Sequence, residues 1–239
     1  MNQPKDKLIA ALDVDSQEEA MAAVERMEGA LAWVKVGARL FSATGPSVVG
    51  LLKQQGLKVF LDLKFHDIPA TVASACANAV ASGADMINVH ALGGRAMMAE
   101  GAAAARNAAK ASGHSSPIVI AVTVLTSMGP EDLRLLGFNQ SPEELALHLA
   151  CEAKAAGLDG VVASAHEVAA IKKVNGPDFV VVTPGIRPAW ASVDDQKRIM
   201  TPAQALGMGA DFLVVGRPIF AAADPKAAAL QTLKEMEEE

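Results

Sequence analysis

The segment VFLDLKFHDIPATV, residues 59–72, places an amine between two carboxylates. Asp62 and Lys64 are two positions apart in an apolar run that reads as a strand, so their side chains are expected to point to the same face. Asp67 follows three residues later, beyond the expected end of the strand. The resulting pattern, D-x-K-x-x-D, brings charged groups of opposite sign together at one strand end.

Two further charged residues follow neighbouring predicted strands and extend this pattern. Lys35 and Asp13 are expected to join Asp62 and Lys64 in a network of alternating charge, which favours the protonated form of Lys64. An anion bound there meets a fixed carboxylate: like charges about 4 Å apart repel by roughly 4 kcal/mol at an effective dielectric near 20. If the anion is a substrate carboxylate, its loss as CO2 relieves the repulsion, and Lys64 can protonate the carbanion. Decarboxylation without a cofactor is therefore a chemically sensible use of the D-x-K-x-x-D pattern.

A second set of residues follows the last two predicted strands. VVTPGIRP (181–188) and VVGRPIF (214–220) each end a strand with a glycine followed closely by an arginine, Arg187 or Arg217. A glycine such as Gly216 lets backbone N–H groups approach an anion, and arginine offers a bidentate fork for phosphate. The alternative interpretation is a pair of turn glycines with solvated arginines.

The stretch between these two motifs, residues 188–202, is polar and irregular around Asp194 to Arg198. A loop here would fold over a bound phosphate, with Gln196 as a hydrogen-bonding tip. A surface loop without a function is the alternative, and the spacing alone favours neither.

Short apolar, β-branched runs recur along the chain, each ending near Gly, Asp, Thr or Pro. We read strands at residues 7–14, 33–37, 58–64, 86–91, 117–124, 160–164, 179–185 and 211–216. Ala-rich helical segments lie between most of them, as at 16–27 and 70–83, and a further helix opens at Ser141-Pro142 and closes at Gly157. An extra short helix fits near 130–137.

Strands that are apolar on both faces and separated by helices indicate a buried parallel sheet. Eight such units in 239 residues favour a closed (β/α)8 TIM barrel over an open doubly wound sheet, the main alternative. No Pro/Gly-rich linker divides the chain, which predicts a single domain over 1–239. Active sites of such barrels lie at the C-terminal strand ends. The polar residues expected there are Asp13, Lys35, Asp62, Lys64, Asp67, His90, Thr126, Arg187 and Arg217.

Composition excludes several classes of function. Twenty-seven acidic against 21 basic residues give a net charge of −6, and aromatic residues make up 4%, so neither a basic footprint nor a stacking platform for nucleic acid is expected. Two cysteines and five histidines show no disulfide framework and no metal-ligand spacing. No apolar stretch has the length of a membrane span, and no secretory segment is read, so a cytoplasmic protein is expected.

The motifs together resemble one known family over essentially the whole chain. FLDLKFHDIPATV, Asp13, Lys35, TPGIRP and VVGRPIF are similar, in order and spacing, to the orotidine 5′-phosphate decarboxylases of the bacterial type. The resemblance implies a β/α barrel that converts orotidine 5′-monophosphate to UMP and CO2, the last step of de novo UMP synthesis. It also implies that no metal and no organic cofactor take part.

The resemblance also implies roles for individual residues. Lys64 would stabilise and protonate the C6 carbanion, and Asp62 would lie beside the departing carboxylate. Lys35 and Asp13 would orient Lys64 and the ribose hydroxyls. The family forms homodimers, in which Asp67, with Ile68 and Thr71, would enter the partner's site. The phosphate would be held by Arg217, the Gly216 backbone and Gln196, with Arg187 nearby, and Thr126 or Ser127 would contact the base.

Three other functions compete with this one. The 3-keto-gulonate 6-phosphate decarboxylases also carry D-x-K-x-x-D, but they use a magnesium ion held partly by an acid at the end of the second strand, where this chain has Lys35. A phosphosugar isomerase or epimerase is the second alternative. A catalytically silent barrel that binds a partner is the third, against which the intact set of Asp62, Lys64 and Asp67 argues.

Overall fold

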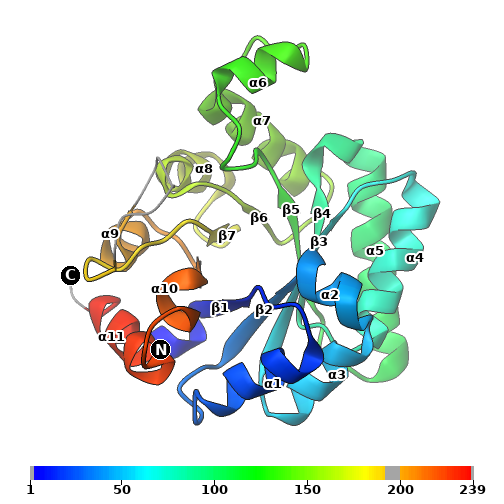
Figure 1. Ribbon diagram of the computed structural model, residues 1–239. Helices are drawn as coiled ribbons and strands as arrows, with labels where there is room; N and C mark the ends of the chain where they lie inside the picture. The colour runs from blue at the N-terminus through cyan, green and yellow to red at the C-terminus, as the bar shows by residue number, and fades with distance from the viewer. Residues whose placement is uncertain (1–2, 192–199, 238–239) are drawn as a thin grey trace.

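The computed structural model describes residues 3–191 and 200–237. In this part of the chain, eight parallel strands close into a barrel in which each strand pairs with the next (Figure 1). They are β1 (Leu8–Leu12), β2 (Trp33–Gly37), β3 (Lys58–Phe65), β4 (Met86–His90), β5 (Ile118–Val122), β6 (Gly160–Val162), β7 (Val180–Thr183) and β8 (Phe212–Val215). Pairing of Leu8 with Leu213 closes the ring between β1 and β8. The predicted (β/α)8 barrel is confirmed, and the open doubly wound sheet is excluded.

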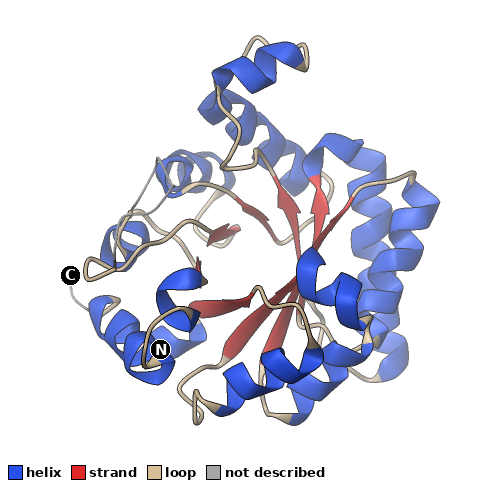
Figure 2. Cartoon of the chain, viewed as in Figure 1, coloured by secondary structure: helices blue, strands red, loops and turns tan. Residues whose placement is uncertain are grey.

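Helices surround the ring of strands on its outside, as Figure 2 shows. They are α1 (Gln17–Glu25), α2 (Ala38–Thr44), α3 (Ser47–Gln54), α4 (Pro69–Ala81), α5 (Gly94–Ser112), α6 (Pro130–Leu135), α7 (Pro142–Ala155), α8 (Val168–Asn175), α9 (Pro202–Gly207), α10 (Arg217–Phe220) and α11 (Pro225–Glu235). None of the described helices combines the length and the apolar character that crossing a membrane requires.

The helix ends follow the capping signals of the sequence. Ser16 accepts a hydrogen bond from the Glu19 N–H at the start of α1, and Ser141 does the same for the Glu144 N–H in α7. These bonds satisfy donors that lack a partner within the helix. The extra helix expected near 130–137 is α6, which extends away from the barrel in Figure 1.

Apolar side chains fill the part of the barrel interior that lies nearer the N-terminal ends of the strands. Trp33 and Phe212 meet edge to face with ring centroids 5.5 Å apart, and the Lys58 ammonium lies 5.4 Å from the centre of the Trp33 ring. The other buried residues of this cluster are Ile9, Ala11, Phe60, Met86, Ile120, Val182 and Val214. Polar side chains nearer the C-terminal ends of the same strands therefore lie next to a tightly packed apolar cluster.

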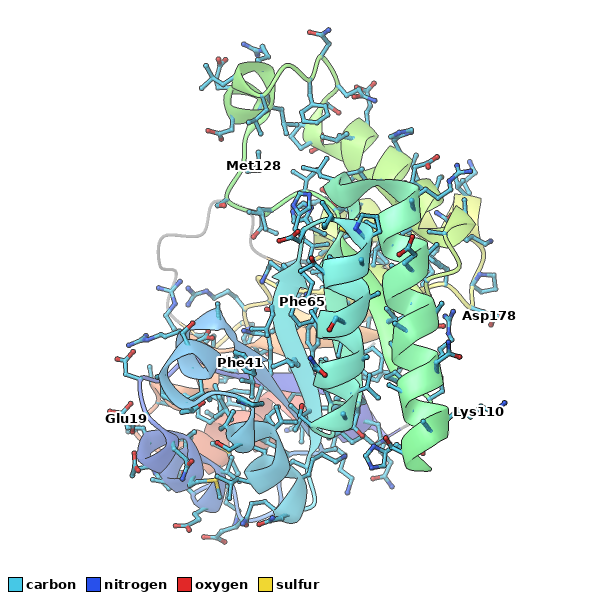
Figure 3. The ribbon with its side chains drawn as sticks, turned by 90° about the vertical axis from the view of Figure 1, so that its right-hand side faces the viewer. Glu19, Phe41, Phe65, Lys110, Met128 and Asp178 are labelled. Carbon is cyan, nitrogen blue, oxygen red and sulfur yellow. The ribbon has the colours of Figure 1, made fainter. Side chains whose placement is uncertain are left out.

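Helices α4 and α5 lie side by side along the outside of the barrel (Figure 3). Gly101 of α5 allows this close approach: a Cβ at that position would lie 3.2 Å from Val72 and 3.3 Å from the Cys76 sulfur in α4. The loop that connects β3 to α4 contains Asp67 and Ile68, so this packing fixes where that loop leaves the barrel.

An aspartate precedes three of the even-numbered strands at the end of the barrel opposite the polar strand ends. Each carboxylate accepts the backbone N–H of a valine in the preceding strand at 2.7 Å and pairs with a cation from a helix. The trios are Asp85 with Val59 and Lys53, Asp159 with Val119 and Arg106, and Asp211 with Val181 and Lys172. We call them the strand clamps. Each clamp joins two neighbouring strands through a charge-assisted hydrogen bond.

Removing one clamp is expected to destabilise the fold. In Asp159→Ala the Val119 N–H loses its side-chain acceptor and Arg106 loses its ion pair, keeping the Gly157 carbonyl, so the free energy of unfolding should fall by about 1–3 kcal/mol. Glu131→Ala is the control: its pair with Arg134 is exposed on α6, so the loss should stay below about 1 kcal/mol. Urea unfolding measures both, and equal losses would show that the clamp adds nothing beyond a surface ion pair.

Candidate active site

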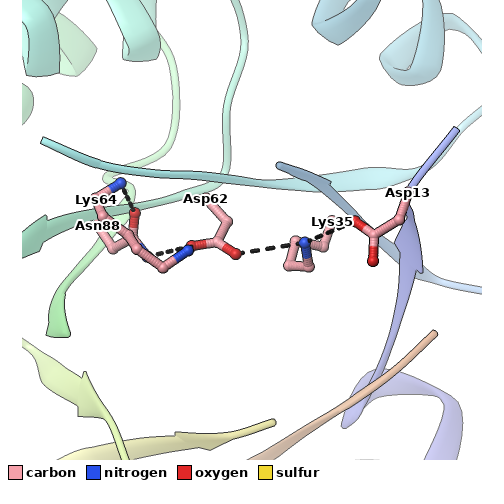
Figure 4. A network of polar contacts seen from close by, with 5 residues as sticks. All are labelled: Asp13, Lys35, Asp62, Lys64 and Asn88. Carbon is pink, nitrogen blue, oxygen red and sulfur yellow. Dashed lines mark hydrogen bonds and ion pairs between the residues drawn. The ribbon is translucent and has the colours of Figure 1, made fainter. Parts of the chain in front are cut away.

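Four charged residues form a chain of contacts across the C-terminal ends of β1, β2 and β3 (Figure 4). The Lys35 ammonium lies 3.3 Å from Asp13 Oδ1 and 3.4 Å from Asp62 Oδ2. The Lys64 ammonium lies 2.6 Å from Asp62 Oδ1. The predicted network of alternating charge is therefore present, in the order Asp13, Lys35, Asp62, Lys64.

The members of this network differ in their contact with solvent. The side chains of Lys35 and Asp62 are 12% and 13% exposed, whereas Lys64 is 38% and Asp13 56% exposed. The two inner charges stabilise each other where water is scarce, and the two outer groups remain accessible to a ligand.

Asp62 stays ionised although its side chain is largely buried. Burial alone would raise the pKa of this carboxyl, but the ammonium groups of Lys35 and Lys64 and the hydrogen bonds from Lys64 and Asn88 outweigh it. The pKa of Asp62 is consequently held below its ordinary value. Asp62 is thus a fixed anion at neutral pH.

The side chain of Lys64 contacts Asp62, but the backbone of β3 at this point is not that of a regular strand. Its backbone φ is +51°, and the pairing of β3 with β4 shifts register between Leu61 and Phe65. The Lys64 N–H donates to Asn88 Oδ1 at 2.8 Å, and Asn88 Nδ2 donates to Asp62 Oδ1 at 2.7 Å. The expected meeting of the two side chains is confirmed, but the regular strand geometry assumed for it is wrong.

Sequence reasoning missed Asn88, although a signal for it exists. It is a fully buried polar residue in the apolar strand β4, at a position whose side chain points into the barrel. A buried amide is retained only when its hydrogen bonds are satisfied, so an asparagine at such a position indicates a polar partner nearby.

Two histidines stack next to Lys64. The rings of His66 and His90 have centroids 5.3 Å apart and are inclined by 19°. Burial, helped by His66 and Lys64, lowers the pKa of His90 to about 4, so this ring is neutral near pH 7. His90 also accepts the Leu92 N–H through Nδ1.

A cavity of about 200 Å³ opens directly above the network. Lys35, Asp62 and Lys64 face it on one side, and Thr126 also lines it. The rest of its wall is mostly apolar and comprises Phe60, Val122, Val124, Leu125, Val162, Ala163, Pro184 and Val214. Such a space suits a small, mostly apolar ligand with a polar or charged group on the side of Lys35, Asp62 and Lys64.

A larger cavity, about 660 Å³, adjoins the first and shares Val124, Leu125, Thr126 and Pro184 with it. Thr126 lines both cavities, whereas Ser127 lines only the larger one. Thr126 is therefore the better placed of the two hydroxyls for contact with a group held beside Lys64.

The predicted phosphate residues follow β7 and β8. Gly216 lies between β8 and α10, and Arg217, the first residue of α10, is exposed, whereas Arg187 is buried in the segment after β7. The backbone N–H of Arg187 donates to the carbonyl of Met200 at 3.1 Å. The interpretation of both arginines as solvated turn residues is wrong for Arg187. Gln196 and the segment from Asp194 to Arg198 lie outside the described residues.

Asp67, Ile68 and Thr71 follow the end of β3 and are not among the four residues of the network. All three are exposed, Ile68 to 66%, on the loop after β3 and the first turn of α4. The Asp67 carboxylate accepts the N–H of Ile68 at 2.6 Å. Within residues 3–191 and 200–237, no group of three or more His, Cys, Asp or Glu side chains is arranged to hold a metal ion.

Comparison with protein families decides to which group this site belongs. Residues 6–232 match the model of the orotidine 5′-phosphate decarboxylase / HUMPS family. The chain belongs to this family. As a member of the orotidine 5′-phosphate decarboxylase / HUMPS family, it carries the D-x-K-x-x-D segment on β3 and the loop that follows.

Individual members of the family are similar over nearly their full length. The chain is 52% identical over 230 residues to the orotidine 5′-phosphate decarboxylase of Syntrophotalea carbinolica, covering 96% of this chain and 94% of the relative. It is 50% identical over 234 residues to that of Moorella thermoacetica, covering 98% and 93%. The crystal structure of orotidine 5′-phosphate decarboxylase from Lactobacillus acidophilus superposes with a TM-score of 0.86 at 40% identity, covering 96% and 98%.

Removal of the Lys35 charge is expected to raise the pKa of Asp62. Burial would then be opposed only by Lys64 and by hydrogen bonds, because the strongest favourable charge is gone. Titration of Lys35→Met by carboxyl-carbon NMR measures this pKa. In Lys53→Met, which removes the partner of Asp85 instead, the pKa of Asp62 should not change.

The same shift links the site to stability. Because the folded-state pKa of Asp62 lies below that of the unfolded chain, the network stabilises the fold above about pH 4 and loses this contribution as the pH falls through the folded-state pKa. An unaltered Asp62 titration in Lys35→Met would show that Lys35 does not hold this carboxyl ionised.

Proposed function

We propose that the protein decarboxylates orotidine 5′-monophosphate to UMP and CO2 in de novo pyrimidine synthesis, without a metal or organic cofactor. The observation that carries the proposal is the contact of the Lys64 ammonium with Asp62 Oδ1, 2.6 Å, at the mouth of the small cavity. Family membership and relatives at about half identity, named orotidine 5′-phosphate decarboxylase, support it.

Binding places the pyrimidine in the small cavity. Apolar walls from Val122, Val162 and Val214 exclude water from the ring, and the Thr126 hydroxyl contacts the base. The substrate carboxylate then lies next to Asp62, which burial and its fixed partners keep from turning away.

The reaction needs one proton and no external electrons. The C6–carboxylate bond breaks, CO2 leaves, and the bonding electron pair stays on C6. The Lys64 ammonium stabilises this carbanion and transfers its proton to C6, and solvent then restores the proton on Lys64. Departure of the carboxylate removes the repulsion from Asp62, which lowers the barrier because the repulsion is present only before the bond breaks.

The phosphate and ribose are held at the same C-terminal rim of the barrel, by residues that follow β7, β8 and β1. Arg217, the Gly216 backbone and Gln196 hold the phosphate, with Arg187 on the same side, and Asp13 contacts the ribose hydroxyls. Phosphate contacts lie far from the breaking bond, so their binding energy can hold the substrate carboxylate against Asp62. Support comes from the position of Gly216 and Arg217 directly after β8, the usual phosphate site of such barrels.

The proposed enzyme is a cytoplasmic homodimer of single-domain subunits. Asp67, Ile68 and Thr71 of each subunit enter the site of the other, where Asp67 completes the alternating charges beside Lys64. Their exposure on the loop after β3 and the first turn of α4 supports this arrangement, because Ile68, at 66% exposure, is a large apolar side chain that a second subunit would cover.

A magnesium-dependent sugar-phosphate decarboxylase is the main competing function. Its metal needs an acid at the end of the second strand, and here Lys35 occupies that strand, with its ammonium between Asp13 and Asp62. A cation in that place neutralises the two carboxylates and repels a divalent ion. The geometry therefore favours the metal-free reaction.

The direct test is loss of the orotate ultraviolet absorbance when the purified protein meets orotidine 5′-monophosphate, with and without EDTA. Turnover that EDTA does not change is expected. Lys64→Ala should fold normally and lose at least about 10³-fold in kcat, because the proton donor is absent. Lys110→Ala, an exposed lysine at the far end of α5, is the matched control and should retain full activity. Folded protein without turnover would reject the assignment.

A hybrid dimer tests the shared site. Lys64→Ala and Asp67→Ala are each expected to be inactive as homodimers. The hybrid of the two, purified through two different tags, has one intact site, because one subunit supplies Lys64 and the other Asp67. It should recover about half of the wild-type activity per dimer.

The control hybrid combines Lys64→Ala with Asp62→Ala. Both residues belong to the same subunit's site, so each site of this hybrid lacks one of them and no activity should return. An inactive Lys64→Ala/Asp67→Ala hybrid would place Asp67 in its own subunit's site or outside the chemistry.

A further inference from the structure

Asn88 is a fully buried amide in the middle of β4, where the neighbouring interior positions on the barrel strands are largely apolar. Both ends of its side chain are used: the carbonyl oxygen accepts the Lys64 N–H at 2.8 Å, and the amide nitrogen donates to Asp62 Oδ1 at 2.7 Å. One side chain on β4 thus contacts the two β3 residues on which the proposed reaction depends.

The first contact fixes the backbone of Lys64. Leu61 pairs with Ile87 and Phe65 pairs with Val89, so the intervening part of β3 has two residues more than the facing part of β4. The Lys64 N–H bonds to the Asn88 side chain, and φ of Lys64 is +51°, a conformation that a lysine adopts only when its surroundings hold it there. The Asn88 carbonyl supplies that restraint.

The second contact fixes the carboxylate of Asp62. Its Oδ1 accepts hydrogen bonds from both Lys64 Nζ and Asn88 Nδ2, while Oδ2 has Lys35 Nζ at 3.4 Å. Because both acceptor directions of Oδ1 are in use, rotation of the carboxylate would break a hydrogen bond, and its orientation relative to a bound substrate is fixed. The amide is neutral, so it orients Asp62 without cancelling the negative charge that repels the substrate carboxylate.

We propose that Asn88 is a positioning residue for decarboxylation: it holds the Asp62 carboxylate and the Lys64 backbone in one fixed relation, so that repulsion and proton donation act on the same substrate atom. This inference rests on the proposed function and adds to it a residue that does not touch the substrate.

The test replaces Asn88 with valine, which removes both hydrogen bonds. For Asn88→Val, kcat should fall about 10²-fold, because misplaced catalytic groups lose most of their effect, while KM stays within about 3-fold of wild type, since the phosphate contacts are intact. The matched control is Asn175→Val on α8, a buried asparagine whose amide donates to the Ile171 carbonyl. That variant should lower the melting temperature and leave kcat unchanged.

The pH profile separates positioning from simple loss of stability. The groups that face Asp62 are Lys35 on β2 and Lys64 on β3, with Asp13 beyond Lys35 and the neutral His90 beyond Lys64. The hydrogen bond from Asn88 helps to lower the pKa of Asp62, so its removal should raise that pKa. The acid limb of kcat/KM should therefore move to higher pH in Asn88→Val and stay in place in Asn175→Val.

Asn88→Asp is the second variant, of nearly unchanged size, in case the valine disturbs folding. It keeps an acceptor for the Lys64 N–H but places a carboxylate against Asp62, so the two share a proton and a new titration should appear in kcat/KM on the alkaline side. Unchanged kcat and pH profiles in both variants, with wild type active on orotidine 5′-monophosphate, would overturn the role of Asn88. An inactive, folded wild type would instead refute the proposed function.

Discussion

Every feature of this site depends on keeping a carboxylate charged where water is scarce. Asp62 is 13% exposed, and a charge so placed is stable only if its surroundings replace the lost hydration. Lys35, Lys64 and Asn88 do so from three adjacent strands, each through a different atom or lone pair. The closed barrel makes this possible because it brings neighbouring strand ends to one rim and fixes their register.

The packed interior below the rim has a mechanical role. Trp33, Phe60 and Met86 fill the barrel beneath the charged residues, so these side chains cannot move down into the core, and apolar valines line the cavity above them. Close packing of this kind leaves the charged side chains at the rim little freedom to move. The pKa of His90 is lowered to about 4, so its ring is neutral and adds no positive charge beside Lys64.

The sequence alone predicts the repeated parts of this architecture better than its irregular ones. Strand and helix periods, helix caps and the D-x-K-x-x-D spacing are local patterns, and they located the eight strands, α6 and the order of the charged residues. The shifted register of β3, the left-handed backbone of Lys64 and the partners of Asn88 depend on which strand lies beside β3, and no local pattern records that. The burial of Arg187 likewise arises from chain segments that are distant in sequence.

The strand clamps also stabilise some strand pairs of the barrel and not others. Asp85, Asp159 and Asp211 join β3 to β4, β5 to β6 and β7 to β8, and the corresponding position before β2 is Ala32. The pair β1 and β2 thus has no such ion pair, and at this position β2 begins with Trp33, whose ring contacts Phe212 and Lys58. Local opening on the timescale of amide exchange should therefore be easier for the β1–β2 pair, which carries Asp13 and Lys35, than for the three clamped pairs. The half of the charge network formed by Asp13 and Lys35 would then loosen before the half formed by Asp62 and Lys64, which lies on the clamped strand β3.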